Sequence, residues 1–197
     1  HGEIDFGSEL QPRVMEFKVH INATPAEKSA LKRKLAAYLN PLNGAKPLID
    51  SQDIEKTYYV KYAGNIDLSN YVNAMQFTIP FKASDPIIYG SFEQTKVGSG
   101  IISNDGTLEC PVVVKITGLV TNPSVTIGAH TLTYTGGLTS SDTLVIDTGA
   151  LTATFNGVNA LINLDGLTPD IVLPVGDTMV TAANGGTTVF SWRERFI

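Results

Sequence analysis

The stretch LTSSDTLVIDTGALTATF, residues 138–155, decides the predicted fold of this 197-residue chain. Its apolar run LVI at 144–146 lies between polar turn residues, and in 151–155 Leu, Ala and Phe alternate with two threonines, the period of a half-buried strand. Asn156 and Gly157 follow, the dipeptide best suited to a tight hairpin turn. Two strands and two turns within so short a stretch predict an antiparallel sheet that a second sheet must cover, which is a β-sandwich.

Composition and charge point the same way. Charged residues make up only 17% of the chain and there are 18 glycines, which suits a β protein with many turns better than a helical bundle. Residues 1–85 contain ten acidic and ten basic residues, whereas residues 86–197 contain nine acidic and four basic ones. All of the net charge of −5 therefore lies in the second part. Because such a domain repels phosphate backbones, we expect no nucleic-acid partner.

The cysteine count and the hydropathy exclude further classes. Cys110 is the only cysteine, so neither an internal disulfide nor a cysteine-based zinc site is possible, and a small buried side chain in a cytoplasm-folded protein is expected there. There is no run of eighteen apolar residues, so we expect no membrane association.

Residues 1–85 predict an α+β domain. Residues 13–21 alternate as a long strand, and Thr24-Pro25-Ala26-Glu27 is a capping box that begins a helix with leucines at every fourth position from 31 to 39. Strands are expected at 57–63 and 71–83, with a possible short strand at 47–49. Pro80 lacks a backbone donor, so its position should face a sheet edge or a bulge.

The opposite face of the predicted helix is basic. It could meet an acidic partner, although a solvated helix face is the usual meaning of such a pattern. The residues concerned are Lys28, Lys32, Arg33 and Lys34.

Residues 86–197 predict the β-sandwich, because turn signals recur every eight to twelve residues. Two of the predicted turns are Asn122-Pro123-Ser124 and Asn184-Gly185-Gly186. The predicted fold class is therefore mainly β: an α+β domain over 1–85 followed by an antiparallel sandwich over 86–197.

No residue pattern predicts an active site, a cofactor site or a metal site. His1, His20 and His130 are far apart and have no catalytic or ligating partner at a known spacing, so structural roles are expected for them. The aspartates of the second part lie in turns, where they usually bond their own backbone, and no calcium-loop motif is present. The glycine pairs do not precede a helix and therefore do not form phosphate-binding loops.

Two alternatives from other classes remain open. A carbohydrate-binding sandwich would need exposed aromatic side chains such as Trp192, Tyr134 or Tyr89, although Trp192 and Phe190 share a strand face that is more typical of a core. A hydrolase would need two carboxylates at glycosidase spacing across a cleft, and no pair in the sequence requires this.

The order of these segments resembles the distal tail (Dit) or phage-tail-component family of long-tailed phages that infect Gram-positive bacteria. The resemblance covers nearly the whole chain. It rests on HGEIDFG at 1–7, RVMEFKVHINATPAEKSALKRKLAAYL at 13–39, KTYYVKY at 56–62, GLVTNPSVTIG at 118–128, LVIDT at 144–148, LPVGD at 173–177 and VFSWRERFI at 189–197.

The resemblance implies a non-enzymatic virion protein, made in the bacterial cytoplasm. In that family the first domain forms a six-fold ring that continues the tail tube, and a galectin-like sandwich projects outward. The ring joins the tube to tail-tip, baseplate or receptor-binding proteins. Enlarged members carry inserted sugar-binding modules, for which the short loops of 86–197 leave no room, so a scaffold is expected. The first strands of the family lie upstream of His1, so the chain resembles an N-terminally shortened member.

A ring subunit needs long strands with exposed edges and a surface that closes under rotation. Residues 15–21 and 75–81 are long enough for this. The polar positions of these two strands are the predicted inter-subunit interface, and they are Glu16, Lys18, His20, Gln76, Thr78 and Lys82.

Overall fold

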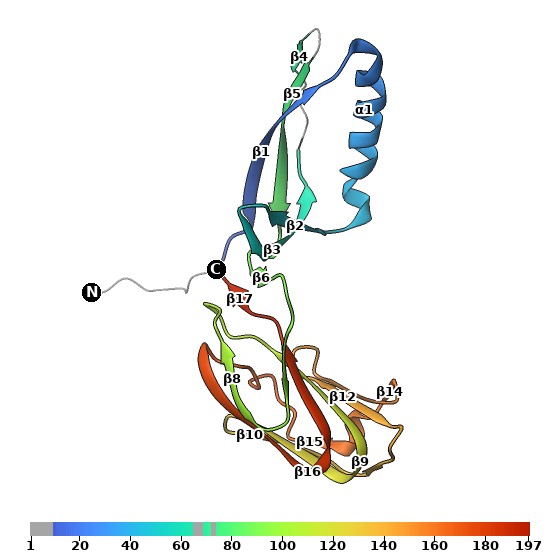
Figure 1. Cartoon of the computed structure of the whole chain (residues 1–197), viewed down its shortest axis with the longest axis vertical. Helices are drawn as coiled ribbons and strands as arrows, with labels where there is room; N and C mark the ends of the chain where they lie inside the picture. Colours follow the sequence, from blue (N-terminus) through green and yellow to red (C-terminus); the bar gives the residue numbers. More distant parts are fainter. Residues whose placement is uncertain (1–9, 65–68, 72–73) are drawn as a thin grey trace, which may run out of the picture. The chain divides into compact units, whose positions relative to one another are not determined.

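The computed structural model describes residues 10–64, 69–71 and 74–197, which divide into two compact units, His1–Ile88 and Tyr89–Ile197 (Figure 1). The predicted boundary after residue 85 lies close to this division. The opening motif HGEIDFG and His1 lie outside the described residues. Each unit is described by itself below.

The first unit is built from one helix and a small antiparallel sheet. Its elements are β1 (Arg13–Asn22), α1 (Pro25–Tyr38), the 3-10 turn η1 (Pro41–Asn43), β2 (Lys46–Asp50), β3 (Asp53–Tyr62), β4 (Ser69–Tyr71) and β5 (Ala74–Ala83). The strand β6 (Ile88–Gly90) spans the point at which the first unit ends.

The predicted helix is confirmed. A capping box begins α1: the backbone N–H and the hydroxyl of Thr24 both donate to Oε2 of Glu27, at 2.9 and 2.7 Å. These bonds lower the pKa of Glu27, because they favour its charged form. The helix ends before Pro41, as the restriction on a residue preceding proline predicts.

In the sheet of the first unit β5 lies between β1 and β3, while β2 pairs with β3 and β4 pairs with β5. Among the described residues, the β3 side of β5 is occupied by β4 at 74–76 and by β3 at 81–82. Pro80 lies in the interval, where its carbonyl accepts from Ala63 N–H at 3.0 Å. That Pro80 faces a sheet edge or a bulge stays a prediction.

The second unit is an antiparallel sandwich. Its elements are β7 (Gln94–Val97), β8 (Gly100–Asn104), β9 (Val112–Ile127), β10 (His130–Tyr134), β11 (Gly137–Leu138), β12 (Thr143–Asp147), β13 (Thr152–Phe155), β14 (Val158–Asn159), the 3-10 turn η2 (Leu161–Asn163), β15 (Leu164–Asp165), β16 (Gly176–Trp192) and β17 (Arg195–Phe196). The predicted fold class, mainly β with an α+β part followed by a sandwich, is confirmed.

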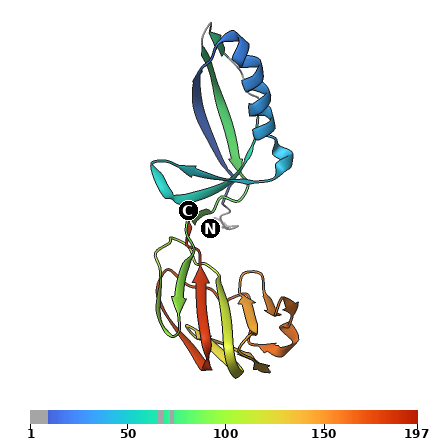
Figure 2. The same ribbon diagram turned by 45° about the vertical axis from the view of Figure 1, so that its right-hand side comes forward.

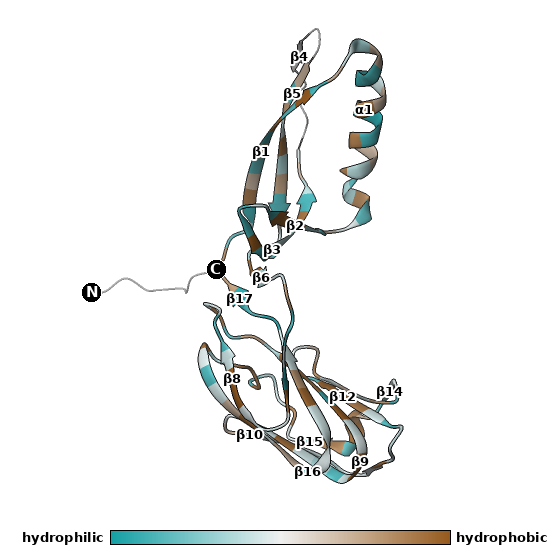
Figure 3. Cartoon of the chain, in the orientation of Figure 1, coloured by the Kyte–Doolittle hydropathy of each residue, from teal (hydrophilic) through white to brown (hydrophobic). Residues whose placement is uncertain are grey.

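The hairpin predicted from residues 138–155 is present, since β12 pairs with β13 from Leu144↔Phe155 to Asp147↔Thr152. Asn156 and Gly157 have φ of 49° and 80° and turn the chain into β14. The alternating side chains appear as alternating bands of hydropathy along the strands (Figure 3). Those of the inner positions, such as Leu144 and Ile146, belong to a single buried core.

The predicted turns at 122–124 and 184–186 are wrong, because both sites lie inside continuous strands, β9 and β16. These strands pair with each other along their length, and the register shifts on either side of Gly185. Asn122, Asn184, Gly185 and Gly186 have positive φ, and Asn184 Nδ2 donates to the carbonyl of Asn122 at 2.7 Å. The two sites face each other at an irregularity of the register, where β9 bulges against β16, and such a site needs the same left-handed residues as a turn.

Because of this irregularity, the two halves of β9 and β16 belong to different layers of the sandwich. The first half of β9 pairs with β12, and the second half pairs with β10. Buried positions change from even numbers (Val114, Ile116) to odd numbers (Val125, Ile127), because β9 has an odd number of extra residues, three, relative to β16 between Thr117 and Ser124. Side chains from both halves therefore share one core.

The chain enters and leaves the second unit at neighbouring positions. Gly90 N–H donates to the carbonyl of Glu194 at 2.9 Å, and the guanidinium of Arg195 lies 5.8 Å from the ring centroid of Tyr89. These contacts hold the first and last residues of the sandwich side by side.

Candidate subunit interface

The six predicted interface residues lie together on one face of the β1–β5 ladder. In the antiparallel register Lys18 is opposite Thr78 and His20 is opposite Gln76, while Glu16 is opposite Pro80. Residues directly opposite each other project from the same face. All six are exposed except Thr78, which is half-buried. The structure thus brings the predicted residues into one polar surface, and their role in assembly stays a prediction.

Strand β1 is the outer strand of this sheet. It pairs with β5 over all ten of its residues, and among the described residues no strand pairs with its other edge. A ten-residue edge with alternating unpaired N–H and C=O groups is able to accept a strand from another chain.

The opposite face of the β1–β5 ladder is apolar. Val19, Ile21, Met75 and Phe77 project from it, and Phe17 meets Phe81 edge to face with their ring centroids 5.8 Å apart. Helix α1 packs on this face (Figure 1). The predicted leucine stripe of the helix is confirmed, because Leu31, Leu35 and Leu39 all contribute to this core.

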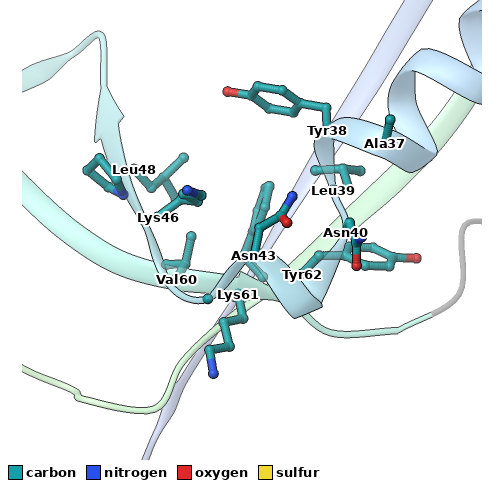
Figure 4. Close-up of a pocket in the computed structure, with 13 residues that line it drawn as sticks. Ala37, Tyr38, Leu39, Asn40, Asn43, Lys46, Leu48, Val60, Lys61 and Tyr62 are labelled. Carbon is teal, nitrogen blue, oxygen red and sulfur yellow. The ribbon is translucent and has the colours of Figure 1, made fainter.

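The cover that α1 provides is incomplete. None of its fourteen residues is buried, and Tyr38 is 84% exposed. One hollow of about 420 Å³ lies at the end of the helix, between Tyr38, Leu39 and the strands β2 and β3 (Figure 4). A second hollow, of about 330 Å³, lies between α1 and β5. Apolar surface left open in this way marks an interaction site in many proteins.

In the second unit the structure pairs two residues that the sequence did not connect. Nε2 of His130 lies 3.8 Å from Oδ2 of Asp170, and the His130 side chain is 39% exposed. The pKa of Asp170 is lowered, mainly by a hydrogen bond from Thr168 and less by His130. Forty residues separate the pair, so no local pattern indicates it. His20, in the first unit, is exposed and contacts Asn22 Oδ1 at 3.2 Å.

Two of the turn aspartates, Asp142 and Asp147, have the local roles that were predicted for them. Asp147 Oδ1 accepts from the N–H groups of Gly149 and Ala150, both at 2.9 Å. Asp142 accepts from the N–H and hydroxyl of Thr139 and from Asn156 Nδ2, all at 2.7 Å, and these bonds lower its pKa. In the described part of the chain no group of three His, Cys, Asp or Glu residues is placed to hold a metal ion.

The remaining candidates are core residues. Cys110 is fully buried, which raises the pKa of its thiol to about 11, as expected of a small apolar side chain. Trp192, Phe190 and Tyr134 are buried in the sandwich core, which confirms the core reading of Trp192 and Phe190. Tyr89 is half-buried beneath Arg195. Trp192 and Tyr134 are therefore unavailable for sugar stacking, and Tyr89 is partly covered.

The only α-helix among the described residues is α1, and no helix there is long and apolar enough to cross a membrane.

Comparison with known proteins first defines a class. Residues 1–83 match the family model described as a phage tail protein RIFT-related domain. The first unit, with its edge strand and partly covered helix, is thus similar to a domain of phage tail proteins.

A solved structure then gives a particular relative. The chain is similar to Dit of phage SPP1, described as a paradigm of the hub adsorption apparatus in phages infecting Gram-positive bacteria. The TM-score is 0.76 at 17% sequence identity, and the similarity covers 96% of this chain and 81% of that chain. The shared fold confirms the resemblance to distal tail proteins. No curated protein matches the chain.

Proposed function

We propose that this chain is a structural hub protein of a phage or prophage tail tip. Six copies form a ring through their first units, and the ring continues the tail tube. The second unit is a galectin-like sandwich that presents attachment surfaces to tail-tip, baseplate or receptor-binding proteins. The protein is made in the bacterial cytoplasm, resides in the virion and catalyses no reaction.

One observation supports this proposal above the others. The part of the chain that matches a phage tail domain is also the part whose edge strand and apolar surface are left open. A subunit of a closed ring needs surfaces of this kind, because its neighbours complete what a monomer leaves uncovered. The similarity to Dit of phage SPP1 supports the hub role.

Within the ring, the free edge of β1 and the adjoining polar surface are proposed to face a neighbouring subunit. Lys18 and Lys82 lie on this surface, so reversing both charges (Lys18→Glu with Lys82→Glu) should reduce the fraction of assembled protein. Lys115→Glu, an exposed lysine of the second unit, is the matched control and should leave assembly unchanged.

The ring is tested by light scattering and negative-stain imaging of the full chain. Six-fold particles of about 127 kDa, six times the 21.1 kDa of one chain, are expected. A chain that remains monomeric at high concentration would contradict the proposal.

A further inference from the structure

The hairpin formed by β2 and β3 ends in an acidic, apolar tip. Its sequence at 49–55 is IDSQDIE, with three acidic residues and no basic one. Ile49 and Ile54 are 51% and 61% exposed, although isoleucine is among the residues most often buried. Asp50, Asp53 and Glu55 are exposed beside them. The tip therefore presents two exposed isoleucines together with three exposed carboxylates.

The groove beside α1 has the opposite character. The hollow between α1 and β5 is lined by apolar side chains, including Leu31, Leu35 and Met75, and by Lys32 and Lys34. Its 330 Å³ is about ten times the ~30 Å³ of a water molecule in the liquid, so it has room for a side chain. Residues 25–38 contain four basic residues and one acidic residue. The groove is thus apolar with a positive rim.

The two surfaces are complementary but lie apart within the subunit. The β2–β3 hairpin projects away from the sheet on the side opposite α1 (Figure 2). In the described part of the first unit, no ion pair joins the acids of the tip to Lys32, Arg33 or Lys34. A contact between the surfaces therefore requires a second molecule.

We propose that the tip of the β2–β3 hairpin of one subunit inserts into the groove beside α1 of the next copy. Ile49 and Ile54 fill the apolar hollow, and Asp50, Asp53 and Glu55 meet the basic rim. The inference rests on the proposed ring and names a contact within it. Because the two surfaces are different and face opposite ways, the contact is head-to-tail, which gives a ring when the rotation between successive copies closes.

Charge reversal tests this contact in the full chain. Asp53→Lys with Glu55→Lys should raise the concentration for half-assembly by about tenfold or more, because like charges would then meet across the interface. Lys32→Glu with Lys34→Glu should do the same. Combining all four changes should restore assembly, since the charges are exchanged. Asp165→Lys with Asp177→Lys, exposed carboxylates of the second unit, is the matched control and should have no effect.

A covalent test uses Ile54→Cys with Tyr38→Cys, two exposed positions on the tip and the groove. Oxidation with diamide should give a ladder of covalent oligomers up to the ring, because each subunit offers both positions to different neighbours. Native Cys110 is fully buried and should not react. Ile54→Cys with Val158→Cys, on the exposed β14, should give no ladder.

The outcomes separate this contact from the ring itself. A wild-type chain that stays monomeric contradicts both. Wild-type rings that form equally well from every charge variant, with no disulfide ladder, contradict the hairpin contact alone. If the charge variants form normal rings but are no longer incorporated into phage tails, the hairpin tip and the groove bind another tail protein. That result would overturn the proposal that they contact each other in two copies of this chain.

Discussion

The two units of the chain differ in how completely each covers its own apolar side chains. In the sandwich, twenty buried residues form one core cluster, among them Phe190 and Ile171, which are fully buried. In the described part of the first unit the corresponding cluster has four, Leu39, Met75, Phe77 and Ile79. A core of the first kind can hold a domain folded by itself, whereas one of the second kind gains stability from a neighbour. We infer that the sandwich is the independent unit.

The largest effect is expected from separating the units at the chain division. Residues 89–197 alone should keep a cooperative thermal unfolding transition, because their core is intact. Residues 1–88 alone should unfold without a sharp transition at low concentration. Circular dichroism and calorimetry of the two fragments measure this. Equal cooperativity in both fragments would remove the contrast between the cores.

A pair of phenylalanines sharpens the contrast at single positions. Phe190 is fully buried, so Phe190→Ala should lower the free energy of unfolding of the sandwich by roughly 3–5 kcal/mol. Phe17 is 37% exposed, and Phe17→Ala should cost the first unit about half of that or less before assembly. Chemical denaturation of the full chain provides both values. Costs of similar size would show that the first unit is packed as tightly as the sandwich.

The bulge that joins the two layers of the sandwich predicts a smaller effect. Gly186 has φ of 74°, and a Cβ there would lie 2.8 Å from the backbone oxygen of Thr117. Gly186→Ala should therefore cost more than the ~1–2 kcal/mol of left-handed backbone strain alone. Gly157→Ala, at φ of 80° with open space around it, is the control for that strain. If both variants lose the same free energy of unfolding, the close approach of β9 and β16 adds no cost to a side chain at residue 186.

The smallest expected effect is a change in the stability of the sandwich at acidic pH. The folded state lowers the pKa of Asp142 below 3.8, so its contribution is present above that pH and is lost as the pH falls through the lowered value. Wild-type protein should lose slightly more sandwich stability between pH 5 and pH 2 than Asp142→Asn does. Asp177→Asn, at an exposed carboxylate outside this turn, should behave as wild type. Urea midpoints at each pH report the difference.

Local patterns predicted the elements whose signal lies in neighbouring residues. The alternation in 13–21, the capping box at Thr24 and the leucines at 31, 35 and 39 each describe a single element, and β1 and α1 follow from them. Alternation also placed Lys18 and His20 on one face of β1. The register that sets them opposite Thr78 and Gln76 depends on pairing across some sixty residues, which the sequence does not reveal.

The wrong predictions have a physical cause. Asn122 and Asn184 occupy left-handed backbone, and the residues that tolerate it are the same in a turn and in a bulge. Whether the chain then reverses depends on the strand beside it, and β9 and β16 hold each other straight through both sites. The sequence did not predict the acidic tip of the β2–β3 hairpin. Residues 47–49 gave only a short and weak strand signal, so the pairing of β2 with β3 could not be expected from it.

The adjoining first and last strands of the sandwich have an evolutionary consequence. Since Gly90 is bonded to Glu194, replacing everything between them by another domain would leave the path of the polypeptide outside unchanged. The sandwich is in this sense an exchangeable cassette. Recombination at these two neighbouring points would exchange residues 89–197 and leave the sequence of residues 1–88 as it is.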